Sequence, residues 1–370
     1  MLFKSTAPAP DQRSLSILCL LLLALVSNTN GAALNASHYQ YYRVEEPQGT
    51  QADTAADLPL GIVLLHDQDM VRGKAITRAA NLTAIRWAHA VNSQQLLDEA
   101  LAGDIEFIEA DIVLGKVNGE GDDMPVMAHP PANVSDLTLQ GFLNQIKDFN
   151  DLHEGNEKGV KLDFKSIEVF EGSLDILDAT IPSMSYPIWI NADIISGPVD
   201  QNKSVPVNPD RFFAGCMRYK QAVLSIGWTT NWGADFREGE YTKDQCDAMV
   251  ESLSLNNVLS TGQGITFPVR AGIAANSEEQ LHKLVAAVNE TNESTLTIWS
   301  SDGDYVDVAK LRKLIFGFGV ERVYLDVPDE LAARLDLGNA GNGAGTFNSL
   351  VSFSFISLCF YAFATWLQRG

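Results

Sequence analysis

The sequence predicts an α/β protein whose main part is a (β/α)8 TIM barrel, and three observations carry this prediction. Short runs of β-branched and apolar residues alternate with amphipathic stretches from residue 83 onward, a pattern typical of repeated βα units around a parallel sheet. Eight such runs follow one another over roughly 250 residues, which is the size of a barrel of this kind. An open doubly wound sheet is the main alternative, but its Gly-rich phosphate turn does not follow the first run.

The predicted strands lie at 85–90, 107–112, 160–164, 188–194, 223–228, 265–270, 296–300 and 322–327. The predicted helices between them are 94–102, 139–151, 242–253, 277–289 and 306–316, each with apolar residues at three- and four-residue spacing. We therefore expect one barrel domain over 83–337, preceded by a polar leader and linker over 34–82.

Both ends of the chain carry hydrophobic segments typical of export and anchoring. Residues 17–26 form an apolar run behind Lys4 and Arg13, and small residues follow it, which predicts a signal peptide over 1–33. A second run at 350–367 follows a small-residue spacer over 338–349, an order that favours a GPI-anchor signal. The alternative is a single transmembrane helix with Arg369 as its cytoplasmic charge. We expect the barrel at the extracellular face of the plasma membrane, or secreted.

The cysteines and the sequons fit passage through the secretory route. Cys19 and Cys359 lie in the terminal segments, so Cys216 and Cys246 remain as the pair of the barrel, and we expect them to form a disulfide. A free buried pair is the alternative. Glycosylation is predicted at the Asn-x-Ser/Thr sites Asn35, Asn81, Asn133, Asn202, Asn289 and Asn292.

The formal net charge of −21 disfavours two classes of binding partner. Bulk electrostatics disfavour nucleic acid and anionic lipid headgroups as ligands of so acidic a chain. A locally positive pocket stays compatible with this charge.

Three acidic residues lie where barrel enzymes place their catalytic groups. Glu109 and Asp111 are two residues apart in the second predicted strand, so their side chains share a face. Asp163 and Lys165 share a face in the same way at the end of the third predicted strand. Carboxylates on neighbouring strands suit a hard divalent cation, Mg²⁺ before Ca²⁺, better than zinc. The alternative is that the acids only cap loops or form salt bridges.

Two histidines frame these acids. His89 ends the first predicted strand, and His129 follows the second in a short extended segment. An imidazole pair can take a proton from one oxygen and give one to another near neutral pH. We therefore expect His89, His129 and Lys165 to be catalytic, although a single histidine of this kind is as often structural.

The rim of the barrel offers candidates for substrate binding. Arg270 ends the sixth predicted strand and could form a bidentate pair with phosphate oxygens, with a salt bridge to an acid as the alternative. Asn191, Trp228 and Trp299 are expected in the pocket wall, with packing in the barrel core as the alternative for each tryptophan.

The segments WAHAVNS, FIEADI, MAHPP, KGVKLDFK, WINADI and SIGWTT together resemble the menorin family over residues 83–335. That family is similar to the glycerophosphodiester phosphodiesterases and to the spider-venom sphingomyelinase D enzymes, which share a phospholipase-C-like barrel. The resemblance implies an acid/base pair, three metal ligands, a lysine after the third acid and a substrate-binding asparagine, which fall here on His89, His129, Glu109, Asp111, Asp163, Lys165 and Asn92. The chain departs from the bacterial glycerophosphodiesterases at Ala90, where these have Arg, so phosphate binding in their manner is not implied.

These residues predict a phosphoric diester hydrolase or lyase that depends on a divalent metal. The expected substrate is a glycerophosphodiester or a lysophospholipid-like molecule with a hydroxyl next to the phosphate, cleaved by acid/base catalysis between two histidines. The alternative is a non-catalytic surface protein, because menorin family members resemble extracellular cues that act with adhesion proteins in shaping neuronal dendrites. Fold alone does not choose between the two.

Overall fold

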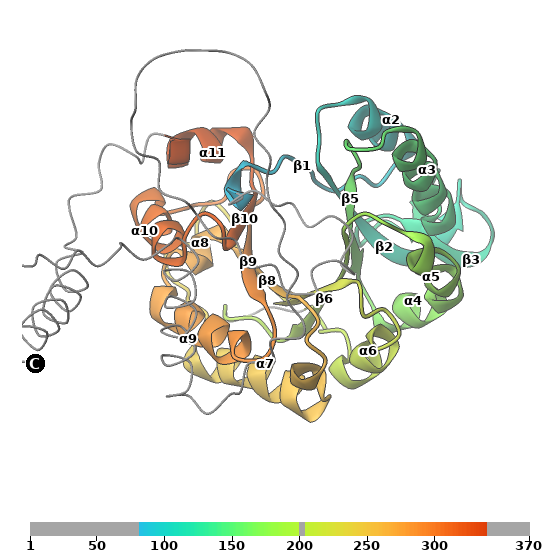
Figure 1. Cartoon of the computed structure of the whole chain (residues 1–370). Helices are drawn as coiled ribbons and strands as arrows, with labels where there is room; N and C mark the ends of the chain where they lie inside the picture. The colour runs from blue at the N-terminus through green and yellow to red at the C-terminus, as the bar shows by residue number, and fades with distance from the viewer. Residues whose placement is uncertain (1–80, 200–203, 339–370) are drawn as a thin grey trace, which may run out of the picture. The chain divides into compact units, whose positions relative to one another are not determined.

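A computed structural model describes residues 81–199 and 204–338 of the chain. Eight strands form a curved sheet in the order β1-β2-β5-β6-β7-β8-β9-β10, each parallel to its neighbours, and helices lie outside it (Figure 1). These strands are β1 (Trp87–Ala88), β2 (Phe107–Val117), β5 (Gly159–Phe164), β6 (Ile188–Ile195), β7 (Val223–Trp228), β8 (Ile265–Arg270), β9 (Ser294–Trp299) and β10 (Val323–Asp326). The predicted barrel is therefore confirmed as a near-closed parallel barrel.

The helices of the outer ring include the five that the spacing of apolar residues predicts, with ends shifted by no more than two residues. They are α2 (Gln94–Ala102), α3 (Leu139–Leu152), α4 (Ile167–Gly172), α5 (Leu174–Thr180), α6 (Pro209–Cys216), α7 (Lys243–Leu255), α8 (Ala271–Ala274), α9 (Glu278–Asn289), α10 (Val308–Phe318) and α11 (Asp329–Leu335), with short 3-10 turns η4 (Leu82–Ala84), η5 (Ile181–Ser183) and η6 (Val258–Ser260). Several begin at a side chain that accepts a hydrogen bond from a first-turn backbone N–H, as the preference for Ser, Thr, Asn and Asp at N-caps predicts: Ser93, Thr138, Ser166, Asn208, Thr242 and Asp307.

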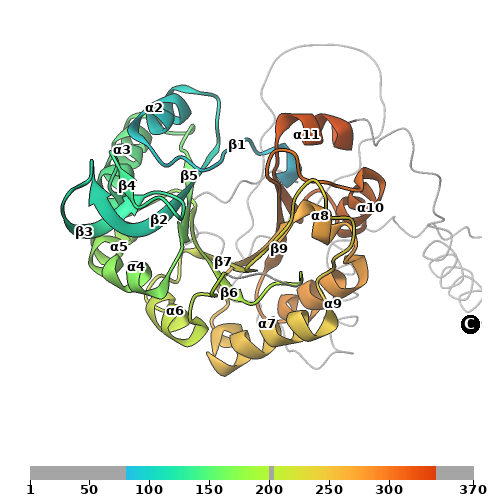
Figure 2. The same cartoon turned by 180° about the vertical axis from the view of Figure 1, so that it is seen from behind.

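A hairpin extends β2 beyond the barrel, and the sequence pattern did not predict it. β2 continues to Val117 and pairs antiparallel with β3 (Glu120–Met127), while the short β4 (Val134–Ser135) also pairs with β2 (Figure 2). The turn between β2 and β3 contains Asn118 and Gly119 with φ of 52° and 82°. An Asn-Gly pair with positive φ is a hairpin signal, but the polar residues of β3 hide the alternation on which strand prediction depends.

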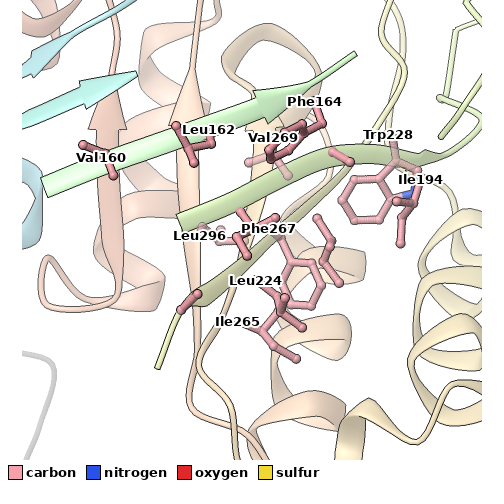
Figure 3. Close-up of a cluster of buried hydrophobic side chains, with 14 of the residues drawn as sticks. Val160, Leu162, Phe164, Ile194, Leu224, Trp228, Ile265, Phe267, Val269 and Leu296 are labelled. Atoms are coloured by element: carbon pink, nitrogen blue, oxygen red, sulfur yellow. The ribbon is translucent and has the colours of Figure 1, made fainter. Parts of the chain in front are cut away.

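Along each barrel strand the side chains alternate between the helices and the barrel interior. The outward set forms the main hydrophobic core, as in the buried Val160, Leu162 and Phe164 of β5 (Figure 3). The inward set is polar near the carboxyl ends of the strands, where a barrel places its functional groups.

Aromatic residues close the opposite end of the interior. Trp87, Phe107, Trp189 and Tyr324 come from four different strands, and their ring centroids lie 4.6 to 6.3 Å apart in the contacting pairs. Gly159 makes room for this aromatic floor, because a Cβ there would lie 2.5 Å from an atom of the Phe107 ring. The floor separates the polar site from solvent at the amino ends of the strands.

The barrel has a seam between its first and last strands. β1 covers only Trp87–Ala88, shorter than predicted, because Ala90 turns the chain with a φ of 54°. Within the described part of the chain, β1 and β10 share no ladder hydrogen bonds. A backbone bond from Leu82 N to Val320 O (2.9 Å) and a side-chain bond between His89 and Asp326 cross the seam instead.

The predicted disulfide is wrong for this structure. Cys216 on α6 and Cys246 on α7 are both free and buried. Each thiol packs as a small apolar group in the main core. Burial raises the pKa of Cys216 well above its usual value and that of Cys246 to about 12, which keeps both thiols protonated.

One predicted glycosylation site is also wrong. Asn292 is 1% exposed, and its Nδ2 donates to the backbone oxygens of Gln263 (2.8 Å) and Val258 (3.3 Å), so a folded chain has no room for a glycan there. Asn81, Asn133 and Asn289 are exposed, and glycosylation at these stays a prediction.

The other predictions on the ends of the chain lie outside the described residues. These are the signal peptide, most of the leader and linker, Asn35, Asn202, the small-residue spacer beyond residue 338 and the hydrophobic run at 350–367. No helix among the residues that the structure does describe has the length and apolarity to cross a bilayer.

Candidate metal centre and active site

Three carboxylates from β2 and β5 meet in the barrel interior. Glu109, Asp111 and Asp163 each present an oxygen, and these atoms lie within 4.8 Å of one another. The strand register places Asp111 directly beside Asp163, and Glu109 and Asp111 are 2% and 3% exposed. The structure thus brings together the acids that share a face in the sequence pattern, and we call them the acidic cluster.

Lys165 neutralises part of this cluster. Its Nζ lies 2.6 Å from an oxygen of Asp111 and 2.5 Å from an oxygen of Asp163. Burial alone would lower the pKa of Lys165, but the neighbouring carboxylates outweigh it and raise the pKa well above the usual range. Lys165 is therefore a fixed positive charge of the site.

The two asparagines that were expected to bind substrate hold the carboxylates instead. Asn92 donates from Nδ2 to Asp111 (2.7 Å) and accepts the Asp111 backbone N–H (2.9 Å). Asn191 donates to Asp163 (2.7 Å) and accepts from the hydroxyl of Ser225 (2.6 Å). These contacts fix the orientation of two carboxylates, as partners behind metal ligands do.

His89 contacts the cluster from the first strand. Its Nδ1 lies 2.8 Å from Asp326 and 3.7 Å from Glu109, and the side chain is 45% exposed at the mouth of the barrel. Burial would lower the pKa of His89, but the carboxylates of Glu109 and Asp326 outweigh it and raise the pKa to about 9. Asp326, at the end of β10, is 3% exposed and was not singled out in the sequence, although it lies within the predicted strand 322–327.

His129 is connected to the cluster through the backbone of the residue before it. The Ala128 N–H bonds to the Asp111 carbonyl oxygen (3.0 Å). The exposed ring of His129 has Nδ1 2.7 Å from the Pro130 carbonyl oxygen, so Nδ1 donates there. Nε2 is then the nitrogen left for exchange with a ligand.

The predicted pocket wall is only partly formed as expected. Arg270 makes a bidentate ion pair with Asp304 (2.8 and 3.0 Å) and lies over the Trp299 ring, which corresponds to the salt-bridge alternative. Trp299 is half-buried on the same face of its strand as Thr297, whose hydroxyl points inward. Trp228 points outward, is 1% exposed and donates to the Gln245 carbonyl of α7, so its placement in the pocket is wrong (Figure 3).

Two more charged residues of the interior escaped the sequence interpretation. Asp193 lies two residues after Asn191 on β6, and burial, with the charge of Asp163, raises its pKa to about 7. Lys161 lies two residues before Asp163 on β5 and is 4% exposed. The spacing rule that connects Asp163 with Lys165 applies to both, so a period-two reading of these strands would have found them.

The charges of the interior leave room for a cation. The carboxylates of Glu109, Asp111, Asp163, Asp193 and Asp326 face two lysines, Lys161 and Lys165. Burial and the nearby Asp111 charge raise the pKa of Glu109 to about 7. Oxygen-only donors within one small cluster fit Mg²⁺ or Ca²⁺.

Several known proteins are similar to this chain in sequence or in structure. The family model described as the Menorin N-terminal domain matches residues 81–332. The human protein FAM151B is 34% identical over 259 residues, which cover 70% of this chain and 87% of the human protein. Among solved structures, a glycerophosphoryl diester phosphodiesterase from Parabacteroides distasonis gives a TM-score of 0.40 at 13% identity, covering 70% of this chain and 88% of that one. A phosphodiesterase from Oleispira antarctica, in complex with the product sn-glycerol-3-phosphate, gives 0.39 at 13% identity, covering 70% and 99%. Because the family model covers residues 81–332, which include all eight barrel strands, this chain belongs to the menorin family.

Proposed function

We propose that this protein is a divalent-metal-dependent phosphodiesterase. The observation that carries the proposal is the acidic cluster at the carboxyl end of the barrel, with Lys165 bound to two of its members and His89 beside the third. Metal ligands, a fixed cation and an acid/base group at one end of a barrel are the parts that phosphodiester cleavage needs.

The donor set suits the ion, and the chain supplies the rest of the chemistry. Glu109, Asp111 and Asp163 would hold a divalent cation, which, when bound, supplies positive charge against the phosphoryl oxygens. Lys165 adds a second positive charge at the same place, because its ion pairs with Asp111 and Asp163 keep its amine protonated against the opposite effect of burial.

The two histidines are the groups that exchange protons with the substrate. Asp326 engages Nδ1 of His89, so Nε2 is the nitrogen that remains for a substrate oxygen. The Pro130 carbonyl holds Nδ1 of His129 in the same way. One ring takes the proton of the attacking hydroxyl or water and the other protonates the leaving oxygen, which gives a cyclic phosphate or a monoester.

The substrate class follows from the chemistry of the site. A phosphodiester with a neighbouring hydroxyl, such as a glycerophosphodiester or a lysophospholipid, provides both the phosphate and the internal nucleophile. The site faces solvent at the mouth through His89, so a small headgroup can reach it.

We also propose that the barrel works outside the cell, anchored to the plasma membrane or secreted. The apolar runs at 17–26 and 350–367 support this. Expression of the full chain on cultured cells tests it. A phosphatidylinositol-specific phospholipase C should release a GPI-anchored protein into the medium, whereas a transmembrane form stays on the cells and an internal location refutes the proposal.

The activity is tested on residues 35–337 secreted from cultured cells. The protein is incubated with lysophospholipids, sphingomyelin and glycerophosphodiesters, with Mg²⁺ or with EDTA, and products are followed by ³¹P NMR. Asp163→Asn, His129→Ala and Asp326→Asn should each reduce turnover by at least about a hundredfold. His153→Ala is the matched control, since that exposed histidine stacks on Phe149 at the end of α3.

A recognition protein is the second candidate, and one contact favours it. Arg270, the expected phosphate ligand, is engaged in a bidentate ion pair with Asp304. An extracellular adhesion protein would then be the partner of the barrel. Divalent-ion binding without turnover on any of the substrates would favour this candidate over the enzyme.

A further inference from the structure

Lys161 is a buried lysine in the barrel interior for which the proposed reaction has no use. It lies on β5, on the same face as Asp163 and Lys165, and the strand register places it directly beside Glu109 on β2. Only 4% of the residue is exposed. A lysine is almost never this buried unless something compensates its charge.

The ammonium of Lys161 differs from the other interior cations because it has no close partner. Lys165 bonds to two carboxylates, and Arg270 bonds to one in bidentate fashion. Among the described residues, Lys161 makes no hydrogen bond and no ion pair within 4.0 Å. Its long side chain is therefore not committed to any single acid.

Lys161 instead lies within electrostatic reach of several acids at once. Burial would lower the pKa of Lys161, but the charges of Glu109, its neighbour in the strand register, and of Asp326 and Asp163 outweigh it and raise the pKa. Glu109 belongs to the acidic cluster and Asp326 bonds to His89. The charge of Lys161 therefore acts on both the acidic cluster and the Asp326–His89 pair. A position between several carboxylates, beyond direct contact with any of them, is what a shared counter-charge requires.

We infer that Lys161 is a positioning residue, an internal counter-cation shared by Glu109 and Asp326. It lets the barrel fold with these carboxylates side by side before any ion binds, and it limits how tightly the site then holds a divalent ion. The first half of this inference, the role in folding, stands on the contacts of the chain alone. The second half, the effect on ion affinity, rests on the proposed metal-dependent function.

A double-mutant cycle in EDTA tests the first half. The residues 35–337 protein is compared with Lys161→Met, Glu109→Gln and the double variant by thermal unfolding. Lys161→Met should lower the midpoint by about 5–10 °C, because it leaves buried carboxylates without their counter-charge. Adding Glu109→Gln should restore at least half of that loss.

Ion binding tests the second half without any assay of activity. Removal of a positive charge from the interior should tighten the binding of Ca²⁺ and Mg²⁺ at least about tenfold in isothermal titration calorimetry. Saturating ion should therefore raise the midpoint of Lys161→Met more than that of the unmodified protein. Loss of a lysine with only a structural role would not produce this rescue.

Lys158 provides the matched control. It precedes β5, is 2% exposed and donates to the backbone oxygens of Ile105 (2.8 Å) and Gly103 (3.0 Å), away from the acidic cluster. Lys158→Met should destabilise the protein as well, but with no rescue by ion and no coupling to Glu109→Gln.

The outcomes distinguish failure of the inference about Lys161 from failure of the proposed metal-dependent function. If the two substitutions lower the thermal midpoint additively in EDTA, or if the double variant does not fold, Lys161 is not a counter-cation. A Lys161→Met protein that folds only together with Glu109→Gln supports it. Ion affinity that is unchanged or weaker in Lys161→Met overturns the second half. If no variant binds an ion, the metal-dependent function fails, and the cycle in EDTA still decides the role of Lys161.

Discussion

Asn292 tests how hydrogen bonds stabilise the connections at the amino ends of the barrel strands. Its buried amide joins two connections, because Nδ2 donates to the Gln263 carbonyl before β8 and to the Val258 carbonyl in η6. Its Oδ1 accepts from the Thr291 hydroxyl at 2.8 Å. Asn292→Ala removes all three bonds without changing the neighbouring sequon at Asn289.

The expected loss follows from these contacts. Each of the three lost hydrogen bonds costs about 1 kcal/mol net, and the two buried carbonyls left without a donor add up to about 1 kcal/mol each. The sum for Asn292→Ala is about 3–5 kcal/mol, since the residue is 1% exposed and water does not replace the amide. For a domain of this size that corresponds to a midpoint lower by about 6–20 °C.

Thermal unfolding of residues 35–337 measures this loss, with Asn289→Ala as the control. Asn289 is exposed and accepts mainly from Arg322 (3.0 Å), so its removal should cost only about 0.5 kcal/mol. Mass spectrometry of the secreted protein should find no glycan on Asn292, because a chain modified there cannot bury the amide. Equal midpoints for the two variants, or a folded protein with a glycan on Asn292, would refute the reasoning.

Three further predictions concern packing, charge and the thiols. Gly159→Ala should lose about 1–3 kcal/mol because its Cβ would meet the Phe107 ring at 2.5 Å, while Gly264→Ala, whose Cβ would be 3.5 Å from its nearest neighbour, should stay within about 0.5 kcal/mol in urea unfolding. Arg270→Lys should lose about 2–4 kcal/mol in the same assay, because lysine cannot keep the bidentate contact with Asp304, which is 3% exposed; an unchanged midpoint would contradict this. The two barrel cysteines should react with a thiol reagent only after unfolding, and a reductant should leave the thermal midpoint unchanged, whereas a midpoint that falls on reduction would reinstate the disulfide.

The strands and the acidic cluster could be predicted because both depend on local periodicity. A period of two puts Glu109 and Asp111 on one face, and the same rule places Asp163 and Lys165 together. The alternation of strands and helices then sets these pairs on neighbouring strands of one barrel. Nothing beyond the spacing of residues along one chain is needed for that step.

The roles of the polar partners could not be predicted, because they depend on contacts between distant segments. Asn92 and Asp111 are paired by the way the first turn folds over β2, and Asn191 meets Asp163 through the register of two strands. Sequence spacing does not give the register between strands. For the same reason the pairing of His89 with Asp326, at the far end of the domain, could not be predicted.

The position of His89 depends on whether the seam between β1 and β10 is closed or locally unfolded. The first and last strands meet there through the His89–Asp326 bond and one backbone bond from η4, so the seam is the part of the ring with the fewest backbone bonds to break. Regions of this kind open far more often than the whole domain unfolds. Each opening separates His89 from the carboxylate that holds its Nδ1, so the amide hydrogens of β1 and β10 should exchange faster than those of β5 to β8. Their exchange rates then report the fraction of time for which the histidine is out of place.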